Sequence, residues 1–94
     1  MDLNTYRTRI DAIDQNLVSL FIQRMHLSAQ IAAYKKENCL PIHIPAREQF
    51  VLESVCTQSG PEMAEYVQSL YSTIFELSRA YQHACSLESN TEVI

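Results

Sequence analysis

The chain has 94 residues and a formal net charge of −4 at pH 7, and 47% of its residues are hydrophobic. This length allows one domain with a small core, and the hydrophobic content excludes a disordered chain. One glycine and three prolines are too few for a β-sandwich or barrel, and the negative charge argues against nucleic-acid binding, so we expect an all-α protein with another kind of ligand.

The first predicted helix begins near Asn4 or Thr5 and continues to about Glu37, with no proline or glycine inside it. Its apolar residues alternate spacings of three and four, which indicates one narrow buried seam: Leu3, Tyr6, Ile10, Ile13, Leu17, Leu20, Leu27, Ile31 and Tyr34. Such a helix is roughly 50 Å long, more than a domain of this size can cover. We therefore expect a two-fold dimer in which the long helices pack together.

Arg24 interrupts this seam where a hydrophobic residue is expected. A buried guanidinium is costly unless it meets an anion. Arg24 and Lys35 face within about 20° of each other and lie roughly 16 Å apart along the helix, with Ser28 and Ile31 between them. Their side chains can therefore lean together and hold a small anion. Arg7 lies about 26 Å from Arg24, so it can join this site only from a second chain.

The segment NCLPIHIPAREQ contains the first break in the helical pattern. Asn38 can end the first helix, Pro41 prevents its continuation, and Pro45 suits the first position of a second helix that ends near Thr57. The side chains expected to face inward from this second helix are Phe50, Val51, Leu52 and Val55, while Arg47 and Glu48 lie on its first turn.

Gly60 and Pro61 mark the second break. A third helix is predicted from Pro61 to about Cys85, and its inward-facing residues are expected to be Met63, Val67, Leu70, Ile74, Leu77 and Tyr81. Ser78 and Gln82 form a polar strip beside that seam. Residues 1–86 are thus expected to form one helical domain, followed by a polar tail at residues 87–94.

Each charged residue also has a purely structural interpretation. Arg7 can pair with Asp11 or Asp14 on the surface, and Lys35 with its neighbour Lys36 can simply suit the negative end of a helix. Ser78 and Gln82 can face solvent. Arg24 is harder to explain in this way, because its place on the seam follows from the spacing of many residues.

The remaining reactive residue types predict neither a cofactor nor a metal site. Cys39, Cys56 and Cys85 are odd in number and far apart, which favours free thiols in the cytoplasm. The three histidines, His26, His43 and His83, lack metal-ligand spacing and are expected at the surface. No secretion signal or membrane-spanning run is recognisable.

Taken together, the motifs resemble the AroQ-class chorismate mutases. The resemblance rests on R-x-x-I-D-x-I-D from Arg7, the segment around Arg24, A-x-Y-K-K-E-N, L-P-I-x-x-P-x-R-E and E-x-S-x-x-x-Q, and it covers about Leu3 to His83. It implies an intertwined homodimer of three-helix chains, one helix long and two shorter, that converts chorismate to prephenate for phenylalanine and tyrosine synthesis.

The same resemblance implies roles for individual residues. Arg24 would bind a substrate carboxylate within its own chain, and Arg7 of the other chain would bind the second carboxylate. Lys35 and Gln82 would flank the ether oxygen of the substrate. Three further residues complete the implied site, with Arg47 near the carboxylate end, Glu48 at the ring hydroxyl and Ser78 near the ring carboxylate.

One position departs from the family pattern. Ile44 stands where many members have an aspartate, which leaves Glu48 to hold the substrate hydroxyl. An isochorismate-pyruvate lyase of salicylate synthesis would share the fold and the cations, and Ile44 weakly favours it, whereas Glu48 and Ser78 favour the mutase. A non-catalytic helical dimerisation or regulatory module is the other alternative, although such a module would not need buried cations.

Overall fold

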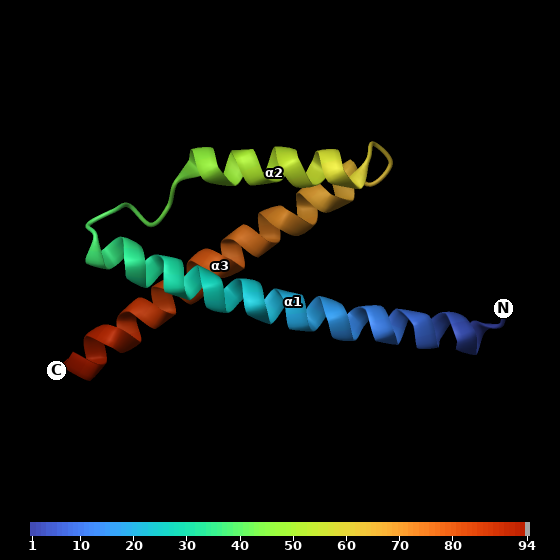
Figure 1. Ribbon diagram of the computed structural model, residues 1–94, viewed down its shortest axis with the longest axis horizontal. Helices are drawn as coiled ribbons and strands as arrows, with labels where there is room; N and C mark the ends of the chain where they lie inside the picture. Colours follow the sequence, from blue (N-terminus) through green and yellow to red (C-terminus); the bar gives the residue numbers. More distant parts are fainter. Residues whose placement is uncertain (94) are drawn as a thin grey trace.

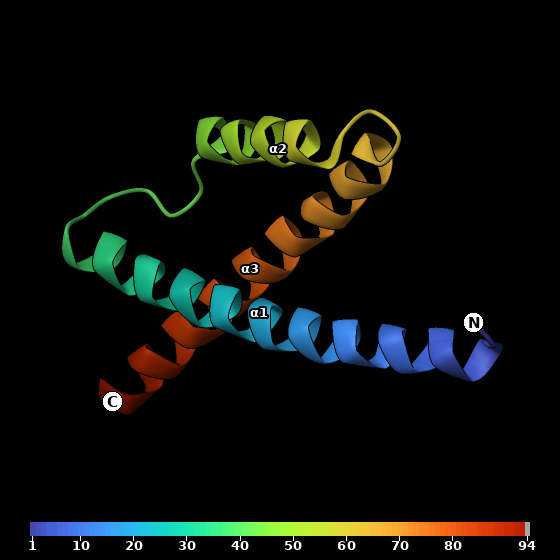
Figure 2. The same cartoon turned by 45° about the vertical axis from the view of Figure 1, so that its right-hand side comes forward.

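The computed structural model describes the backbone of residues 1–93 and the side chains of residues 1–86. These residues form three helices and no strand: α1 (Leu3–Glu37), α2 (Pro45–Ser59) and α3 (Ala64–Val93). Helix α3 crosses α1 and packs against α2 at its other end, so it is the helix that both others contact (Figures 1 and 2). The all-α prediction is confirmed, and the molecule is elongated, with extents of 58 × 28 × 15 Å.

Helix α1 begins one to two residues earlier than predicted because Asp2 caps it. The Thr5 backbone N–H and the Thr5 hydroxyl both donate to Asp2 Oδ1 at 2.9 Å, which satisfies a free donor of the first turn. These hydrogen bonds to Thr5, the backbone one foremost, hold the pKa of Asp2 below its ordinary value.

The C-terminus of α1 is closed by a Schellman motif. The Leu40 N–H donates to the Lys35 carbonyl at 2.7 Å, and the Cys39 N–H donates to the Lys36 carbonyl at 3.3 Å. Asn38 is the C-cap, as predicted, and Cys39 has a φ of 56°, in the left-handed region where glycine is usual. This turn fixes the direction in which the chain leaves Lys35 toward α2.

Cys39→Gly is expected to stabilise the protein by about 1 kcal/mol, because glycine adopts this backbone conformation without a Cβ clash. The measurement is the free energy of unfolding by urea. Cys39→Ala is the matched control, since it also removes the thiol but keeps the Cβ. An equal gain in both variants would show that the thiol, and not the backbone conformation, was responsible.

Helix α2 starts at Pro45 as predicted and extends two residues past the predicted end. It stops at Gly60, which has a φ of +81°, a backbone conformation that residues with a Cβ rarely adopt. Of the four residues predicted to face inward, Val51, Leu52 and Val55 are half-buried. Phe50 is a correction, because it is 62% exposed and its ring lies beside the Arg47 guanidinium.

Helix α3 begins at Ala64, after a turn in which the Met63 N–H donates to the Gly60 carbonyl at 3.3 Å. It continues to Val93, past the predicted end at Cys85, because no proline or glycine follows to stop it. The polar tail predicted at 87–94 falls on residues whose side chains lie outside the described part of the chain.

The buried residues are few, and they lie where α1 crosses α3. Within residues 1–86 they are Ser28, Ala32, Phe75, Ser78 and Gln82. Small side chains on α1 let the two helices approach closely at this point. Three of the five are polar, so the centre of the chain is formed largely by groups that need hydrogen-bond partners.

The apolar seams predicted for the first and third helices do not form the contact between α1 and α3 within one chain. Every apolar member of the α1 seam, from Leu3 to Tyr34, is exposed. Of the seam predicted for the third helix, Leu70 and Leu77 on α3 and Met63 in the turn before it are also exposed, a correction to the prediction. Val67, Ile74 and Tyr81 are half-buried. The face of α3 that packs is instead the strip through Phe75, Ser78 and Gln82. A stripe of hydrophobic residues shows which face is apolar but not whether the same chain covers it.

The reactive residues agree with the sequence interpretation. All three cysteines are free thiols, and the three histidines are exposed. Over the described residues, none of the helices combines the length and the hydropathy that crossing a membrane requires.

Candidate functional site

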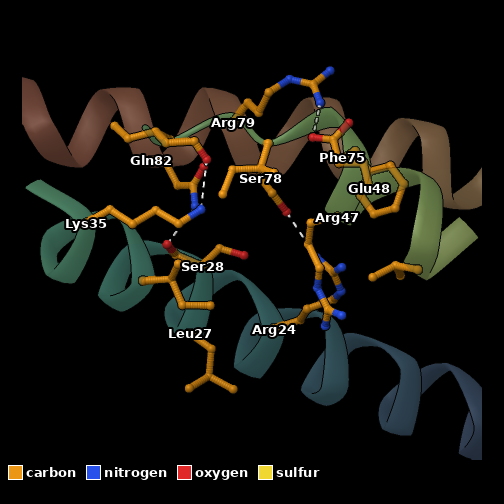
Figure 3. A pocket seen from close by; sticks show the side chains of 14 residues that line it. Arg24, Leu27, Ser28, Lys35, Arg47, Glu48, Phe75, Ser78, Arg79 and Gln82 are labelled. Carbon is orange, nitrogen blue, oxygen red and sulfur yellow. Dashed lines mark hydrogen bonds and ion pairs between the residues drawn. The ribbon is translucent and has the colours of Figure 1, made fainter. Parts of the chain in front are cut away.

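The three helices surround a cavity of about 320 Å³ at the crossing of α1 and α3 (Figure 3). Its lining includes six of the seven residues that the sequence predicted as site residues: Arg24, Lys35, Arg47, Glu48, Ser78 and Gln82. Arg7 is not among the lining residues, and it lies near the N-terminus of α1, in the part that extends away from α2 and α3 (Figure 1). The structure therefore brings together side chains that are up to 58 positions apart in the sequence.

Arg24 occupies one end of the cavity, held by α3. Its Nη1 donates to Ser78 Oγ at 3.3 Å, and its guanidinium carbon lies 5.7 Å from the ring centroid of Phe75 and 5.8 Å from that of Tyr71. These partners fix the guanidinium in place without neutralising it. The ion pairs found among residues 1–86 do not include Arg24. A half-buried cation with neutral neighbours is suited to an external anion.

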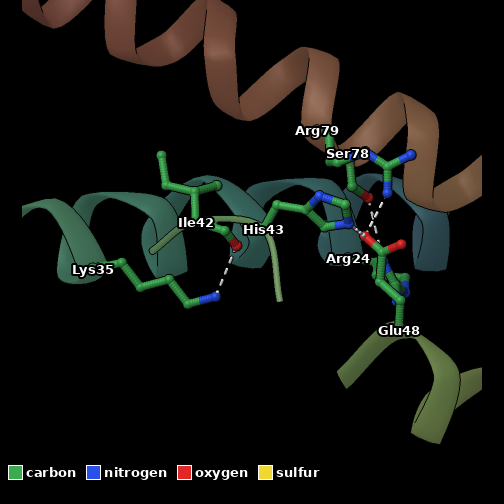
Figure 4. Close-up of polar contacts among 7 residues, drawn as sticks. All are labelled: Arg24, Lys35, Ile42, His43, Glu48, Ser78 and Arg79. Carbon is green, nitrogen blue, oxygen red and sulfur yellow. Dashed lines mark hydrogen bonds and ion pairs between the residues drawn. The ribbon is translucent and has the colours of Figure 1, made fainter. Parts of the chain in front are cut away.

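Lys35 and Gln82 project into the cavity from α1 and α3. Lys35 Nζ donates to the Ile42 carbonyl at 3.0 Å, a contact that ties the loop before α2 to the end of α1 (Figure 4). Gln82 is buried, and its Nε2 donates to the Ser28 carbonyl at 2.8 Å. Ammonium and amide nitrogens each carry more than one hydrogen, so both groups retain donors for a ligand.

Glu48 and Arg47 enter from the first turn of α2. Glu48 Oε2 is ion-paired with Arg79 and lies 3.5 Å from His43 Nε2 (Figure 4). Arg47 lies with its guanidinium carbon 5.3 Å from the ring centroid of Phe50. Helix α2 can present both residues because Pro45 starts it directly beside the cavity.

Arg79 is the charged lining residue that the sequence analysis did not predict. It is half-buried on α3, next to Ser78, and it contacts Glu48 across the α2–α3 interface. The available signal was its position one residue from a predicted site residue and three residues before another. No motif pointed to it, because its partner on α2 is distant in the sequence. Ile44 also lines the cavity, at the position where the family resemblance would place an aspartate.

The charge of the cavity is strongly unbalanced. Four cations line it, namely Arg24, Lys35, Arg47 and Arg79, against a single carboxylate, Glu48, in a chain whose net charge is −4. Such a concentration of positive charge attracts an anion and favours one with more than one negative group. Within the described residues, no cluster of His, Cys, Asp and Glu could hold a metal ion.

Comparison with known proteins identifies relatives across most of the chain. The family described as chorismate mutase type II matches residues 6–83. A bifunctional chorismate mutase/prephenate dehydratase of Buchnera aphidicola subsp. Baizongia pistaciae is 33% identical over 79% of this chain. The T-protein of Haemophilus influenzae is 36% identical over 55% of it, and a bifunctional chorismate mutase/prephenate dehydratase of Aquifex aeolicus is 35% identical over 57%.

These relatives are much longer proteins. The matches cover 20%, 14% and 15% of their respective lengths, so the chain spans a fifth or less of each. No solved structure matches the chain at a comparable level of significance.

Proposed function

The chain belongs to the chorismate mutase type II family, and we propose that it rearranges chorismate to prephenate. The observation that carries this proposal is the convergence of Arg24, Lys35 and Gln82 on one cationic cavity. Chorismate is a small dicarboxylate, and its rearrangement breaks a carbon–oxygen bond while a carbon–carbon bond forms. The reaction needs no proton transfer and no nucleophile. It needs a fixed substrate conformation and donors near the ether oxygen.

Arg24 is proposed to orient one carboxylate of the substrate. Its guanidinium is permanently charged, offers a planar pair of donors, and is already held by Ser78 and Phe75. A substrate carboxylate that reaches Arg24 therefore exchanges water for a pre-oriented partner. Ser78 and Arg47 are proposed to contact the carboxylate groups from α3 and α2.

Lys35 and Gln82 are proposed to donate to the ether oxygen as its negative charge increases in the transition state. Gln82 is fixed by its bond to the Ser28 carbonyl, and Lys35 needs only to move from the Ile42 carbonyl to the substrate. Donors that are already positioned are worth roughly 3 kcal/mol each in comparable sites. Glu48 is proposed to accept a hydrogen bond from the ring hydroxyl of the substrate.

The proposed enzyme is a homodimer with sites shared between the chains. The exposed seam of α1, from Leu3 to Tyr34, supports this proposal because a helix with an uncovered apolar face needs a partner. A second chain lying along α1 would bring its own Arg7 toward the cavity, where it would bind the second carboxylate. The cavity of one chain then lacks only a residue that the other chain supplies.

An isochorismate-pyruvate lyase is the second candidate, and the observation in its favour is Ile44. This residue lines the cavity and offers no acceptor for the substrate hydroxyl. Glu48 and Ser78 both line the same cavity and favour the mutase. The three free thiols are compatible with the proposed setting, which is aromatic amino acid synthesis in the cytoplasm.

The decisive experiment incubates the purified protein separately with chorismate and with isochorismate and identifies the products. We expect consumption of chorismate with formation of prephenate. Formation of salicylate and pyruvate from isochorismate, without prephenate from chorismate, would identify the lyase. A protein that neither binds nor converts either compound would be a non-catalytic module.

A further inference from the structure

The ion pair between Arg79 and Glu48 separates two cavities. On one side is the candidate site, and on the other is a groove of about 340 Å³ between α2 and α3, which includes Glu76 and Gln49. Glu48, Phe75 and Arg79 line both. Arg79 therefore contacts Glu48 at the edge of the site, where α2 meets α3 (Figure 3).

The contacts of Glu48 all fall on one oxygen. Arg79 and His43 both approach Oε2, from α3 and from the loop before α2 respectively. Within residues 1–86, Oε1 accepts no hydrogen bond, so it is the free acceptor of the pair. With Ile44 in place of a second carboxylate, Glu48 is the only acidic side chain among the described residues that line the cavity.

An unrestrained glutamate at this position would be a poor acceptor. Its side chain has three rotatable bonds, and fixing them on binding would reduce the affinity for the ligand. A guanidinium bound to one oxygen restricts these rotations before the ligand arrives. The Glu48 and Arg79 side chains are 29% and 36% exposed, so the pair is partly shielded from solvent.

We propose that Arg79 is a positioning residue. It holds Glu48 through Oε2, so that Oε1 can accept a hydrogen bond from the ring hydroxyl of the substrate. The inference rests on the proposed chorismate mutase function. Because Ile44 has no carboxylate, Glu48 is the only acidic side chain of residues 1–86 that lines the cavity and could bind the hydroxyl end of the ligand. Arg79 would orient that glutamate.

The test uses a bicyclic dicarboxylate that mimics the rearranging substrate, prepared with and without the ring hydroxyl. Binding of both compounds to the full chain is measured by calorimetry for the wild type and Arg79→Gln. We expect the affinity ratio between the hydroxylated and the hydroxyl-free compound to fall about tenfold in Arg79→Gln. The loss of one positive charge weakens both compounds alike and therefore cancels in the ratio.

Three further variants separate positioning from a general structural effect. Arg79→Lys keeps a cation within reach of Glu48 and is expected to restore most of the ratio. Arg9→Gln makes the same charge change at an exposed position of α1 and is expected to leave the ratio unchanged. In a Glu48→Ala background, Arg79→Gln is expected to have no additional effect, because both carboxylate oxygens of residue 48 are gone.

An unchanged ratio in Arg79→Gln would overturn the positioning role, as would an undiminished effect of Arg79→Gln in the Glu48→Ala background. Conversion of chorismate by the wild type is measured in parallel. If the wild type forms prephenate but the ratio does not respond to Arg79, the inference fails and the proposed function stands. If the wild type neither binds the dicarboxylates nor forms prephenate, the function fails and the inference falls with it.

Discussion

Lys35→Ala and Arg24→Ala are each expected to lower kcat/KM for chorismate by about two to three orders of magnitude. Lys35→Ala removes the proposed donor to the ether oxygen, so most of its effect should appear in kcat. Arg24→Ala removes the proposed carboxylate anchor and should also raise KM. Initial rates over a range of chorismate concentrations measure both constants.

The control for Lys35→Ala is Lys36→Ala, which makes the same change at the next residue. Lys36 does not line the candidate cavity, so its replacement is expected to leave turnover within about twofold of the wild type. Circular dichroism should show that all three variants remain helical. Near wild-type turnover in either Lys35→Ala or Arg24→Ala would contradict the proposed mechanism.

Mixing Arg7→Ala and Lys35→Ala chains is expected to restore activity that neither variant has alone. If a site combines Lys35 of one chain with Arg7 of the other, each mixed dimer contains one intact site and one site with both defects. With equal amounts and random exchange, about one quarter of the wild-type activity should return. The recovery should follow the rate at which subunits exchange.

Two measurements accompany this experiment. Sedimentation should give the wild type a mass near twice the 10.8 kDa of one chain. Mixing Lys35→Ala with Arg24→Ala is the matched control. Lys35 and Arg24 of one site come from the same chain, so each site of a mixed dimer lacks one of them and no intact site forms. Absence of recovery after proven exchange between Arg7→Ala and Lys35→Ala would refute the shared site.

The sequence was most informative where a local signal fixes the backbone. Asn38 and Pro45 have strong and specific effects on helix ends, and the boundaries at these two residues are correct. The break at Gly60 is also present, but α2 ends two residues later and α3 begins three residues later than predicted. The family motifs also selected six residues that gather around one cavity, although their roles stay predictions. The end of α3 was wrong, since polar composition alone does not terminate a helix.

The packing faces were harder to predict because apolar periodicity does not identify the partner of a face. Within one chain, α1 meets α3 through Ser28 and Ala32, and the larger hydrophobic residues remain outside. Arg79 was missed for a related reason: its contact with Glu48 depends on how α2 and α3 pack, which no local pattern encodes.

The buried polar residues at the helix crossing are subject to two different requirements, stable packing and the proposed recognition of the substrate. Ser78 and Gln82 are buried at the helix crossing and also line the cavity, so side chains proposed to recognise the substrate also occupy the packed centre. Apolar replacements there would suit the interior but remove groups proposed to recognise the substrate. Selection for thermal robustness alone would therefore be expected to favour apolar side chains at these two positions.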